Sequence, residues 1–259
     1  MRIGAKLPNS GPLSADIPAA AVALERAGFD SLWVADHIVM PERIESPYPF
    51  GQVTWATDIP YVDALIALAL AAAVTTRVRL GTAALVLPQR NPVQLAKQAA
   101  SIDVASGGRL ELGVGAGWLA EEFAALNVPF ERRGARMDEW IAILRECWTG
   151  RTDARRSEFY DLPEGTLCLP APSEIPILIG GHSPAALRRA ARNSGWLAQQ
   201  DADKLDPSTL VFDGRIVLRI VGSLGREALV AERLKEFDVD EVIVDVPIDD
   251  AQRVREVYG

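Results

Sequence analysis

Short apolar runs alternate along the chain with longer segments whose apolar residues recur every three or four positions. The runs predict eight strands, at residues 3–7, 31–35, 78–87, 109–114, 176–179, 195–199, 215–221 and 240–246. The longer segments predict helices at residues 17–27, 61–75, 92–106, 119–126, 134–149, 184–193, 226–237 and 251–258. Such alternation is typical of parallel sheets with right-handed crossovers, and eight units predict an α/β fold closed into a (β/α)8 TIM barrel.

Three connections depart from this regular pattern. The segment between the sixth and seventh strands leaves room for only a short helix, at residues 207–211. Residues 157–172 predict a small hairpin or loop. The connection at residues 40–60 is long and rich in proline, and it carries Tyr48, Phe50 and Trp55. Long connections in compact domains tend to be lids or binding segments, so we expect this one to cover a substrate.

Composition and charge narrow the class of protein. A chain of 259 residues with 49% hydrophobic residues can form one large domain, so we expect a single barrel over residues 1–259. The net charge of −8 argues against a nucleic-acid partner, because phosphate binding requires a basic face. Cys147 and Cys168 lack the spacing of a metal site or a disulfide framework, and no metal is expected.

The most apolar run, at residues 65–74, is far shorter than the ~20 residues that a membrane span needs. The N-terminus lacks the long apolar stretch of a signal peptide. The expectation is therefore a cytoplasmic protein without a membrane partner.

Both histidines of the chain follow predicted strands. His37 comes directly after Asp36 at the end of the second strand, and His182 comes after two glycines at the end of the fifth. Barrels of this kind keep their chemistry at the carboxyl ends of the strands, so both rings are expected on the functional face. His37 can transfer protons near neutral pH or contact a planar ligand, while Asp36 can equally have a structural role.

The turn Gly180-Gly181-His182-Ser183-Pro184 is the strongest ligand signal from the residues themselves. Ser183 is a good N-cap, and Pro184 suits the first helical position. Backbone N–H groups at a helix N-terminus attract phosphate, and a phosphate there would favour a protonated His182. A helix cap that binds nothing is the alternative.

The ends of the third and fourth strands are rich in small residues. Residues 81–88 allow a flat ligand to approach the backbone closely, and tight helix–strand packing is the alternative explanation. Residues 89–92, with Asn91, offer donors at the barrel mouth. The glycines at 113, 115 and 117 are spaced GxGxG, which is not the dinucleotide fingerprint. In a barrel these glycines are expected to shape the site and to direct Trp118 inward.

Arg132, Arg133 and Arg136 lie close in sequence to four glutamates, at positions 121, 122, 131 and 139. A solvated charge network on the surface is one interpretation, since surface ion pairs are common. Anion binding is the other.

Four stretches together carry a family resemblance: residues 31–37, 80–92, 106–118 and 179–183. With them the chain resembles the luciferase-like monooxygenase superfamily, and within it the coenzyme F420-dependent oxidoreductases. The resemblance implies a TIM barrel with a deazaflavin or flavin in its mouth. It also implies that Asp36 and His37 lie close to the ring, that the Ala83–Ala84 peptide bond is cis, and that residues 180–183 hold the cofactor phosphate.

On this basis His37 is the expected catalytic residue and Trp118 a substrate contact. The expected cofactor-binding residues are Asp36, His37, Thr82, Ala83, Ala84, Asn91, Gly115, Gly180, Gly181, His182 and Ser183. Sugar-phosphate dehydrogenases of the superfamily carry a catalytic glutamate where this chain has Trp118, so their acid–base scheme does not transfer. The C-terminal part is shorter than in most relatives, and a homodimer is expected.

The leading hypothesis is an F420-dependent oxidoreductase that transfers hydride between the deazaflavin and a small organic substrate. One alternative is a two-component monooxygenase that uses reduced FMN and dioxygen. A second alternative is a non-catalytic flavin-binding protein, which the shortened C-terminal part and the missing acidic residue would favour.

Overall fold

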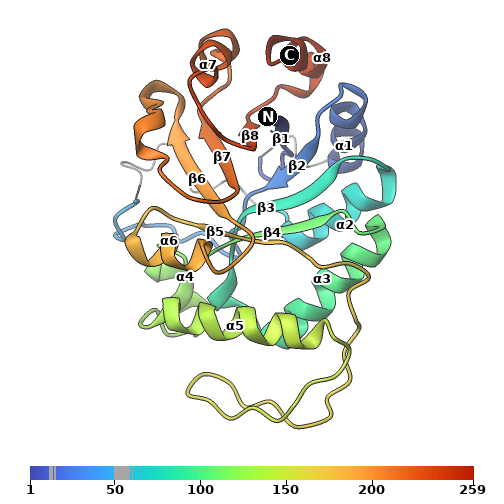
Figure 1. The fold of residues 1–259 in the computed structure, drawn as a ribbon, viewed down its shortest axis with the longest axis vertical. Helices are drawn as coiled ribbons and strands as arrows, with labels where there is room; N and C mark the ends of the chain where they lie inside the picture. The colour runs from blue at the N-terminus through green and yellow to red at the C-terminus, as the bar shows by residue number, and fades with distance from the viewer. Residues whose placement is uncertain (12–13, 15, 50–58, 60) are drawn as a thin grey trace.

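The protein forms a closed barrel of eight parallel strands in sequence order, seen in a computed structural model that describes residues 1–11, 14, 16–49, 59 and 61–259 (Figure 1). The last strand pairs with the first, with Gly4 opposite Ile243. The strands are β1 (Arg2–Lys6), β2 (Ser31–Val34), β3 (Arg79–Val86), β4 (Leu110–Gly115), β5 (Ile177–Gly180), β6 (Trp196–Asp201), β7 (Ile216–Val221) and β8 (Glu241–Val244). The predicted TIM barrel is therefore confirmed.

Helices surround the barrel, and several begin at the residues that the sequence marks as caps. Asn91 accepts a hydrogen bond from the Gln94 N–H at the start of the third helix, and Ser183 does the same for Ala186 at the sixth. The helices are α1 (Ile17–Arg26), α2 (Ala64–Val74), α3 (Pro92–Ser106), α4 (Ala120–Ala125), α5 (Arg133–Cys147), α6 (Pro184–Ala190), α7 (Glu227–Leu234) and α8 (Ala251–Val257).

Two of the three unusual connections lie wholly within the described residues. Between β6 and β7 the predicted helix at residues 207–211 is a single 3-10 turn, Pro207–Thr209, preceded by another at Ala202–Lys204. Between α5 and β5 the chain makes a long excursion away from the barrel, below α5 in Figure 1. Its two sides are joined by the antiparallel bridges Arg151–Leu167 and Arg155–Leu162, in agreement with the predicted hairpin or loop.

Trp33 fills the middle of the barrel because glycines face it from neighbouring strands. A Cβ atom on Gly81 would lie 2.3 Å from the Trp33 ring, and one on Gly4 would lie 2.9 Å from its Nε1. Large apolar side chains complete this interior layer from the other strands: Leu178, Leu197, Val217 and Ile243. Large and small residues thus interdigitate, as close packing requires.

Buried charges close the barrel at the amino ends of the strands. Glu111 on β4 and Glu241 on β8 have fully buried side chains. Arg215 contacts both carboxylates, at 2.8 and 3.3 Å, while Arg79 pairs with Glu111, and Arg2 lies 2.9 Å from Glu241. Each buried carboxylate therefore has two cationic partners, which offsets the cost of removing its charge from water.

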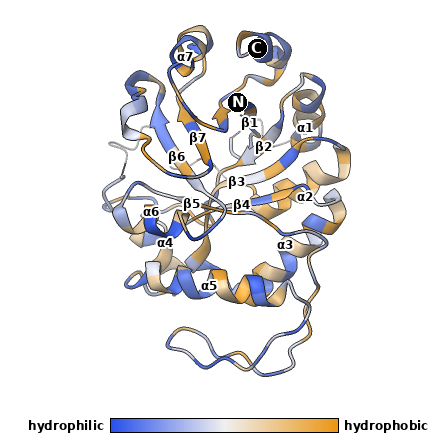
Figure 2. Ribbon diagram, in the orientation of Figure 1, coloured by the Kyte–Doolittle hydropathy of each residue, from blue (hydrophilic) through white to orange (hydrophobic). Residues whose placement is uncertain are grey.

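Helix α2 is unusual because both its buried face and its solvent-exposed face are apolar. Figure 2 shows it coloured hydrophobic along most of its length, whereas α5 alternates between hydrophilic and hydrophobic residues. Ile66, Leu70 and Val74 lie on its exposed side, spaced four residues apart. No helix in the described part of the chain is long and apolar enough to cross a membrane.

Candidate active site

The inward-facing side chains at the carboxyl ends of the strands form what we call the mouth layer. Side chains alternate between the two faces of a strand, so the residue two positions beyond each interior residue also faces inward. For seven strands the count starts from the interior residues Gly4, Trp33, Gly113, Leu178, Leu197, Val217 and Ile243, and β3 is placed by the contacts of Ala84. The mouth layer then comprises Lys6, Ala35, Ala84, Gly115, Gly180, Gln199, Arg219 and Asp245. The half from β2 to β5 has small residues, and the half from β6 to β1 is polar and charged.

The small-residue half of the mouth layer is closely spaced. A Cβ atom on Gly180 would lie 3.5 Å from the Ala84 Cβ, and one on Gly115 would lie 3.7 Å from the same atom. The Ala83–Ala84 peptide bond is cis, as the resemblance implies. The backbones of β3, β4 and β5 therefore come together without side chains between them, and a flat ligand can approach them closely.

His37 lies beside a buried glutamate. Its Nδ1 is 3.3 Å from Oε2 of Glu122 on α4, and the other carboxylate oxygen accepts the backbone N–H of Ile38 at 2.7 Å. The ring of Tyr61 meets the His37 ring edge to face, with centroids 5.3 Å apart. Burial alone would raise the pKa of Glu122, but the hydrogen bond and charge of His37 lower it, so Glu122 is an anion facing the imidazole.

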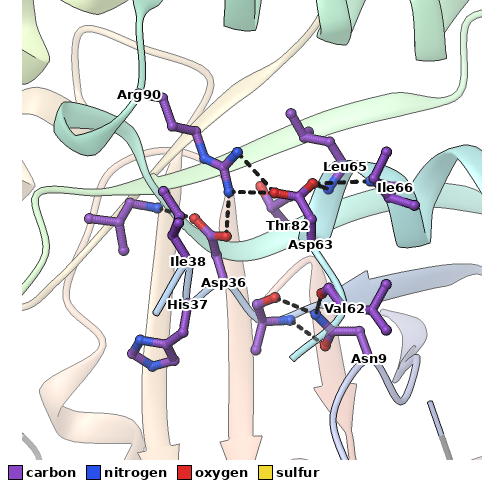
Figure 3. Close-up of polar contacts among 12 residues, drawn as sticks. Asn9, Asp36, His37, Ile38, Val62, Asp63, Leu65, Ile66, Thr82 and Arg90 are labelled. Atoms are coloured by element: carbon purple, nitrogen blue, oxygen red, sulfur yellow. Dashed lines mark hydrogen bonds and ion pairs between the residues drawn. The ribbon is translucent and has the colours of Figure 1, made fainter. Parts of the chain in front are cut away.

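Asp36 points away from His37, toward the helices (Figure 3). One of its carboxylate oxygens lies 2.7 Å from Arg90, and the other accepts the backbone N–H of Val86 at 2.9 Å. Arg90 also donates to Asp63, the N-cap of α2, at 3.1 Å. Burial raises the pKa of Asp36, and Arg90 opposes that shift. Asp36 therefore joins the end of β2 to the start of α2 and to the segment before α3.

The segment after β2 is fixed to the start of α4 by two adjacent glutamates. While Glu122 holds His37 and Ile38, Glu121 accepts the backbone N–H groups of Glu45 and Ser46 at 2.7 and 2.9 Å. The Ser46 hydroxyl also donates to Glu121 at 2.7 Å. These hydrogen bonds outweigh burial and lower the pKa of Glu121 to about 2.

The same segment places Tyr48 over the polar half of the mouth layer. The Tyr48 ring meets Trp118 edge to face with centroids 5.0 Å apart, and its hydroxyl accepts a hydrogen bond from the Gln199 side chain at 3.2 Å. Trp118 is partly buried at the end of β4. This arrangement agrees with a covering role for residues 40–49, while Phe50, Trp55 and Pro60 lie outside the described residues.

The diglycine turn lies at the end of β5, next to the small residues. Gly181 has φ of +111°, and its carbonyl accepts a hydrogen bond from the Trp196 indole at 2.8 Å. The Nε2 atom of His182 accepts the backbone N–H of Gln199 at 3.1 Å, and burial lowers the pKa of this histidine. An accepting Nε2 belongs to a neutral imidazole with its proton on Nδ1, and a phosphate at this turn would oppose that preference.

Besides Asp36, two predicted cofactor residues have side chains engaged elsewhere. The Thr82 hydroxyl is buried and donates to the Gly113 carbonyl at 2.8 Å. Asn91 caps α3 and donates to the Tyr160 hydroxyl at 3.2 Å. Ala84, Gly115 and Gly180 do converge in the mouth layer, with Ala83 next to Ala84 in the chain and with Gly181, His182 and Ser183 directly after Gly180.

The arginines at 132, 133 and 136 do not pair with the glutamates on α4. Arg133 donates to the Gly117 carbonyl at 2.9 Å and lies over the Phe130 ring, and Arg136 donates to the Pro129 carbonyl at 2.7 Å. These contacts fix the chain between β4 and α5. Across the described ranges, no group of three or more histidine, cysteine, aspartate or glutamate residues could hold a metal ion.

Several residues of the candidate site are given no place in it by the sequence analysis. Glu122 lies on helix α4, so a search for polar residues directly after the strands does not find it. Lys6, Arg219 and Asp245 are single charged residues at the ends of apolar runs. Counting every second residue outward from the apolar interior of each strand would have found all three.

The chain belongs to the luciferase-like monooxygenase family, whose sequence model matches residues 2–206. An uncharacterised protein of Mycobacterium tuberculosis is 42% identical over 191 residues, covering 72% of this chain and 66% of that protein. The F420-dependent glucose-6-phosphate dehydrogenase of Amycolatopsis mediterranei is 31% identical over 204 residues, covering 74% of this chain and 57% of that enzyme. The matches thus span about two thirds or less of these relatives.

Solved structures share the fold over the whole chain. An F420-dependent secondary alcohol dehydrogenase in complex with an F420-acetone adduct aligns with a TM-score of 0.76 at 17% identity, covering 99% of this chain and 97% of that one. A monooxygenase of Streptomyces bottropensis aligns with a TM-score of 0.75 at 19% identity, covering 100% and 97%. At these identities the likeness concerns the fold alone, and the fold accommodates both kinds of enzyme.

Proposed function

We propose that this protein is a coenzyme F420-dependent oxidoreductase that transfers hydride between the deazaflavin and a small organic substrate. The observation that carries the proposal is the small-residue half of the mouth layer, where Ala84, Gly115 and Gly180 leave the strand backbones open beside the diglycine turn. The relative from Amycolatopsis mediterranei, whose name states F420 dependence, supports this cofactor over others.

The residues present fit a flat ring system with an anionic tail. A side chain at Gly115 or Gly180 would occupy the surface beside Ala84 on which the ring would lie. The backbone N–H groups from Gly181 to the start of α6 are suited to an anion, and Ser183 holds that turn in place. When bound, F420 supplies a ring carbon that gives or accepts a hydride.

The protein's own residues would orient the reactants, move a proton and exclude water. His37 is the proposed proton donor or acceptor, because Glu122 holds its Nδ1 and leaves Nε2 for exchange with a substrate. Trp118 and Tyr48 are proposed to contact the substrate from the side opposite the strands. Asp36 acts indirectly, since its ion pair with Arg90 fixes the backbone that carries His37.

Titration of the purified protein with F420 and, separately, with FMN tests the cofactor. We expect saturable F420 binding, with FMN at least about tenfold weaker, a difference of about 1.4 kcal/mol. Tighter FMN binding, with oxygen consumption in the presence of reduced FMN, would instead identify a monooxygenase. F420 binding with no turnover across a broad panel of alcohols, aldehydes and ketones would identify a non-catalytic binding protein.

We also propose that the protein is a homodimer that buries the outer face of α2. Ile66, Leu70 and Val74 are 55%, 41% and 40% exposed along one side of this helix. Burying such side chains against a second copy removes apolar surface from water. Light scattering should give twice the chain mass for the native protein and the single mass for Leu70→Glu. A monomeric native protein would contradict the proposal.

A further inference from the structure

Three charged side chains meet at the polar half of the mouth layer, on the neighbouring strands β7, β8 and β1. Val217 on β7 is interior and lies opposite Glu241 on β8. Two residues further along, Arg219 faces inward, and Asp245 follows the interior residue Ile243 in the same way. Since Gly4 lies opposite Ile243, Lys6 falls opposite Asp245. The order of strands around the barrel therefore places Arg219, Asp245 and Lys6 side by side.

Arg219 and Asp245 hold each other in place. They form an ion pair in which both side chains are nearly buried. Asp245 also accepts the backbone N–H of Gly222 at 3.1 Å, and its own N–H donates to the Ser223 hydroxyl at 2.7 Å. Arg219 donates further to the Ile243 carbonyl at 3.3 Å. Burial would raise the pKa of Asp245, but Arg219 and Lys6 lower it, so the carboxylate is charged.

Lys6 differs from these two residues because its ammonium group makes no hydrogen bond or ion pair within the described ranges. The side chain is partly buried at the end of β1. Burial and the charge of Arg219 both lower the pKa of Lys6, while Asp245 raises it. An ammonium carries three donors, and because the Lys6 Nζ is not among the buried polar atoms that lack a partner, a ligand or water at the mouth can reach it.

We propose that Lys6, supported by Arg219, binds a carboxylate group of the substrate. This inference rests on the proposed function, because it places the substrate over the polar half and the cofactor over the small-residue half of one mouth layer. Two positive charges and one negative charge leave a net charge of +1, which one carboxylate balances. A phosphate dianion would exceed that charge and would be repelled by Asp245. Oxo acids or hydroxy acids are therefore the substrate class that the charges favour.

A lysine-directed measurement tests the site without cofactor or turnover. The chain has four lysines, at positions 6, 97, 204 and 235, so reductive methylation with 13C-formaldehyde gives few NMR signals, and Lys6→Gln assigns the one of interest. With sodium acetate added at constant ionic strength, we expect the Lys6 signal to shift saturably while the other three stay unchanged. Arg219→Gln should weaken this response several-fold. Arg253→Gln should not, because Arg253 is an exposed residue on α8 that pairs with Asp250.

Two results would overturn the proposal. One is a Lys6 signal that moves no more than those of the other lysines, and the other is a Lys6 signal that responds to inorganic phosphate at lower concentration than to acetate at the same pH. Because the experiment uses the protein alone, either result leaves the F420 titration to be judged separately. Conversely, if the protein fails to bind F420 but its Lys6 signal responds to acetate as expected, the proposed function is overturned and the carboxylate site is retained.

Discussion

Glu122 on α4 faces His37 at the end of β2, with 3.3 Å between its Oε2 and the imidazole Nδ1. The two residues are 85 positions apart, and Glu122 also accepts backbone N–H groups from Ile38 and Val39. One buried carboxylate therefore orients both the proposed proton carrier and the chain that follows it. Carboxylate–histidine contacts of this kind fix the ring orientation and tautomer.

Glu122→Gln should lower kcat by about tenfold to hundredfold with a small change in KM, because the neutral amide no longer stabilises the charged imidazole. Glu121→Gln, one residue away, is the matched control: it leaves the His37 contact intact and should act mainly on KM through the segment at residues 45–46. The chain has two histidines, so the ring signal of His37 can be followed directly by NMR. An unchanged kcat in Glu122→Gln would show that His37 acts without it.

The segment held by Glu121 should be released in acid. Because its hydrogen bonds lower the pKa of Glu121 from 4.5 to about 2, the carboxylate stabilises the closed segment above pH 4.5. This contribution is lost as the pH falls from 4.5 toward 2. Subtracting the fluorescence of the Trp118→Phe variant from that of the native protein isolates the emission of Trp118. This emission should change between pH 4.5 and 2, since Trp118 contacts Tyr48 in the same segment. In Glu121→Gln the change should be absent, and a persisting transition would assign it to another group.

Gly180→Ala should reduce cofactor affinity by at least about tenfold without unfolding the protein. Its Cβ would lie 3.4 Å from the Val114 carbonyl oxygen and 3.5 Å from the Ala84 Cβ, which the barrel tolerates. The added methyl group would nevertheless occupy the proposed ring surface. Gly134→Ala on α5 is the control, because its closest neighbour is the flexible end of Arg189. Calorimetric titration gives the affinity and thermal unfolding gives Tm. Equal affinity in both variants would place the ring elsewhere.

Gly181→Asp is a less informative variant than Gly180→Ala. Gly181 has φ of +111°, and a Cβ there would lie 3.3 Å from the Ala186 Cβ. Backbone strain would therefore accompany any loss of phosphate binding, and the two effects could not be separated.

Arg90→Leu should destabilise the fold by about 3–5 kcal/mol, because it leaves the buried Asp36 carboxylate without its cation. Adding Asp36→Asn should recover part of the loss, since the two sites share one interaction. Lys235→Leu removes an exposed ion pair with Glu232 and should cost about 0–1 kcal/mol. Urea unfolding measures all of these free energies. If Arg90→Leu lowers the free energy of unfolding as little as Lys235→Leu does, the hydrogen bond from the Val86 N–H is enough to stabilise the buried Asp36 carboxylate.

The sequence predicts the barrel well because its strands are apolar runs separated by clear helix caps such as Asn91 and Ser183. It predicts the helix between β6 and β7 less well, because Pro207–Thr209 makes only one 3-10 turn. The Ser208 N–H donates to the Asp206 side chain there. The cis bond at Ala83–Ala84 was predictable from family resemblance, since nothing in two alanines indicates it.

Residues of the candidate site are predictable where position along a strand decides their direction, and not where long-range contacts do. His37, Gly115 and Gly180 follow from the first rule. Asp36, Thr82 and Asn91 were expected to contact a cofactor, yet their side chains bond to Arg90, Gly113 and Tyr160. Glu122 depends on how α4 packs against the end of β2, and no local pattern contains that information.

The glutamates and arginines at the amino ends of the strands lie at the opposite end of the barrel from the mouth layer. Substitutions around Glu111 and Glu241 should therefore alter how well the chain folds while leaving ligand choice unchanged. Substitutions around Lys6 and Gly180 should do the reverse. Such a division allows substitutions at one end of the barrel to change substrate preference while the other end maintains the stability of the fold.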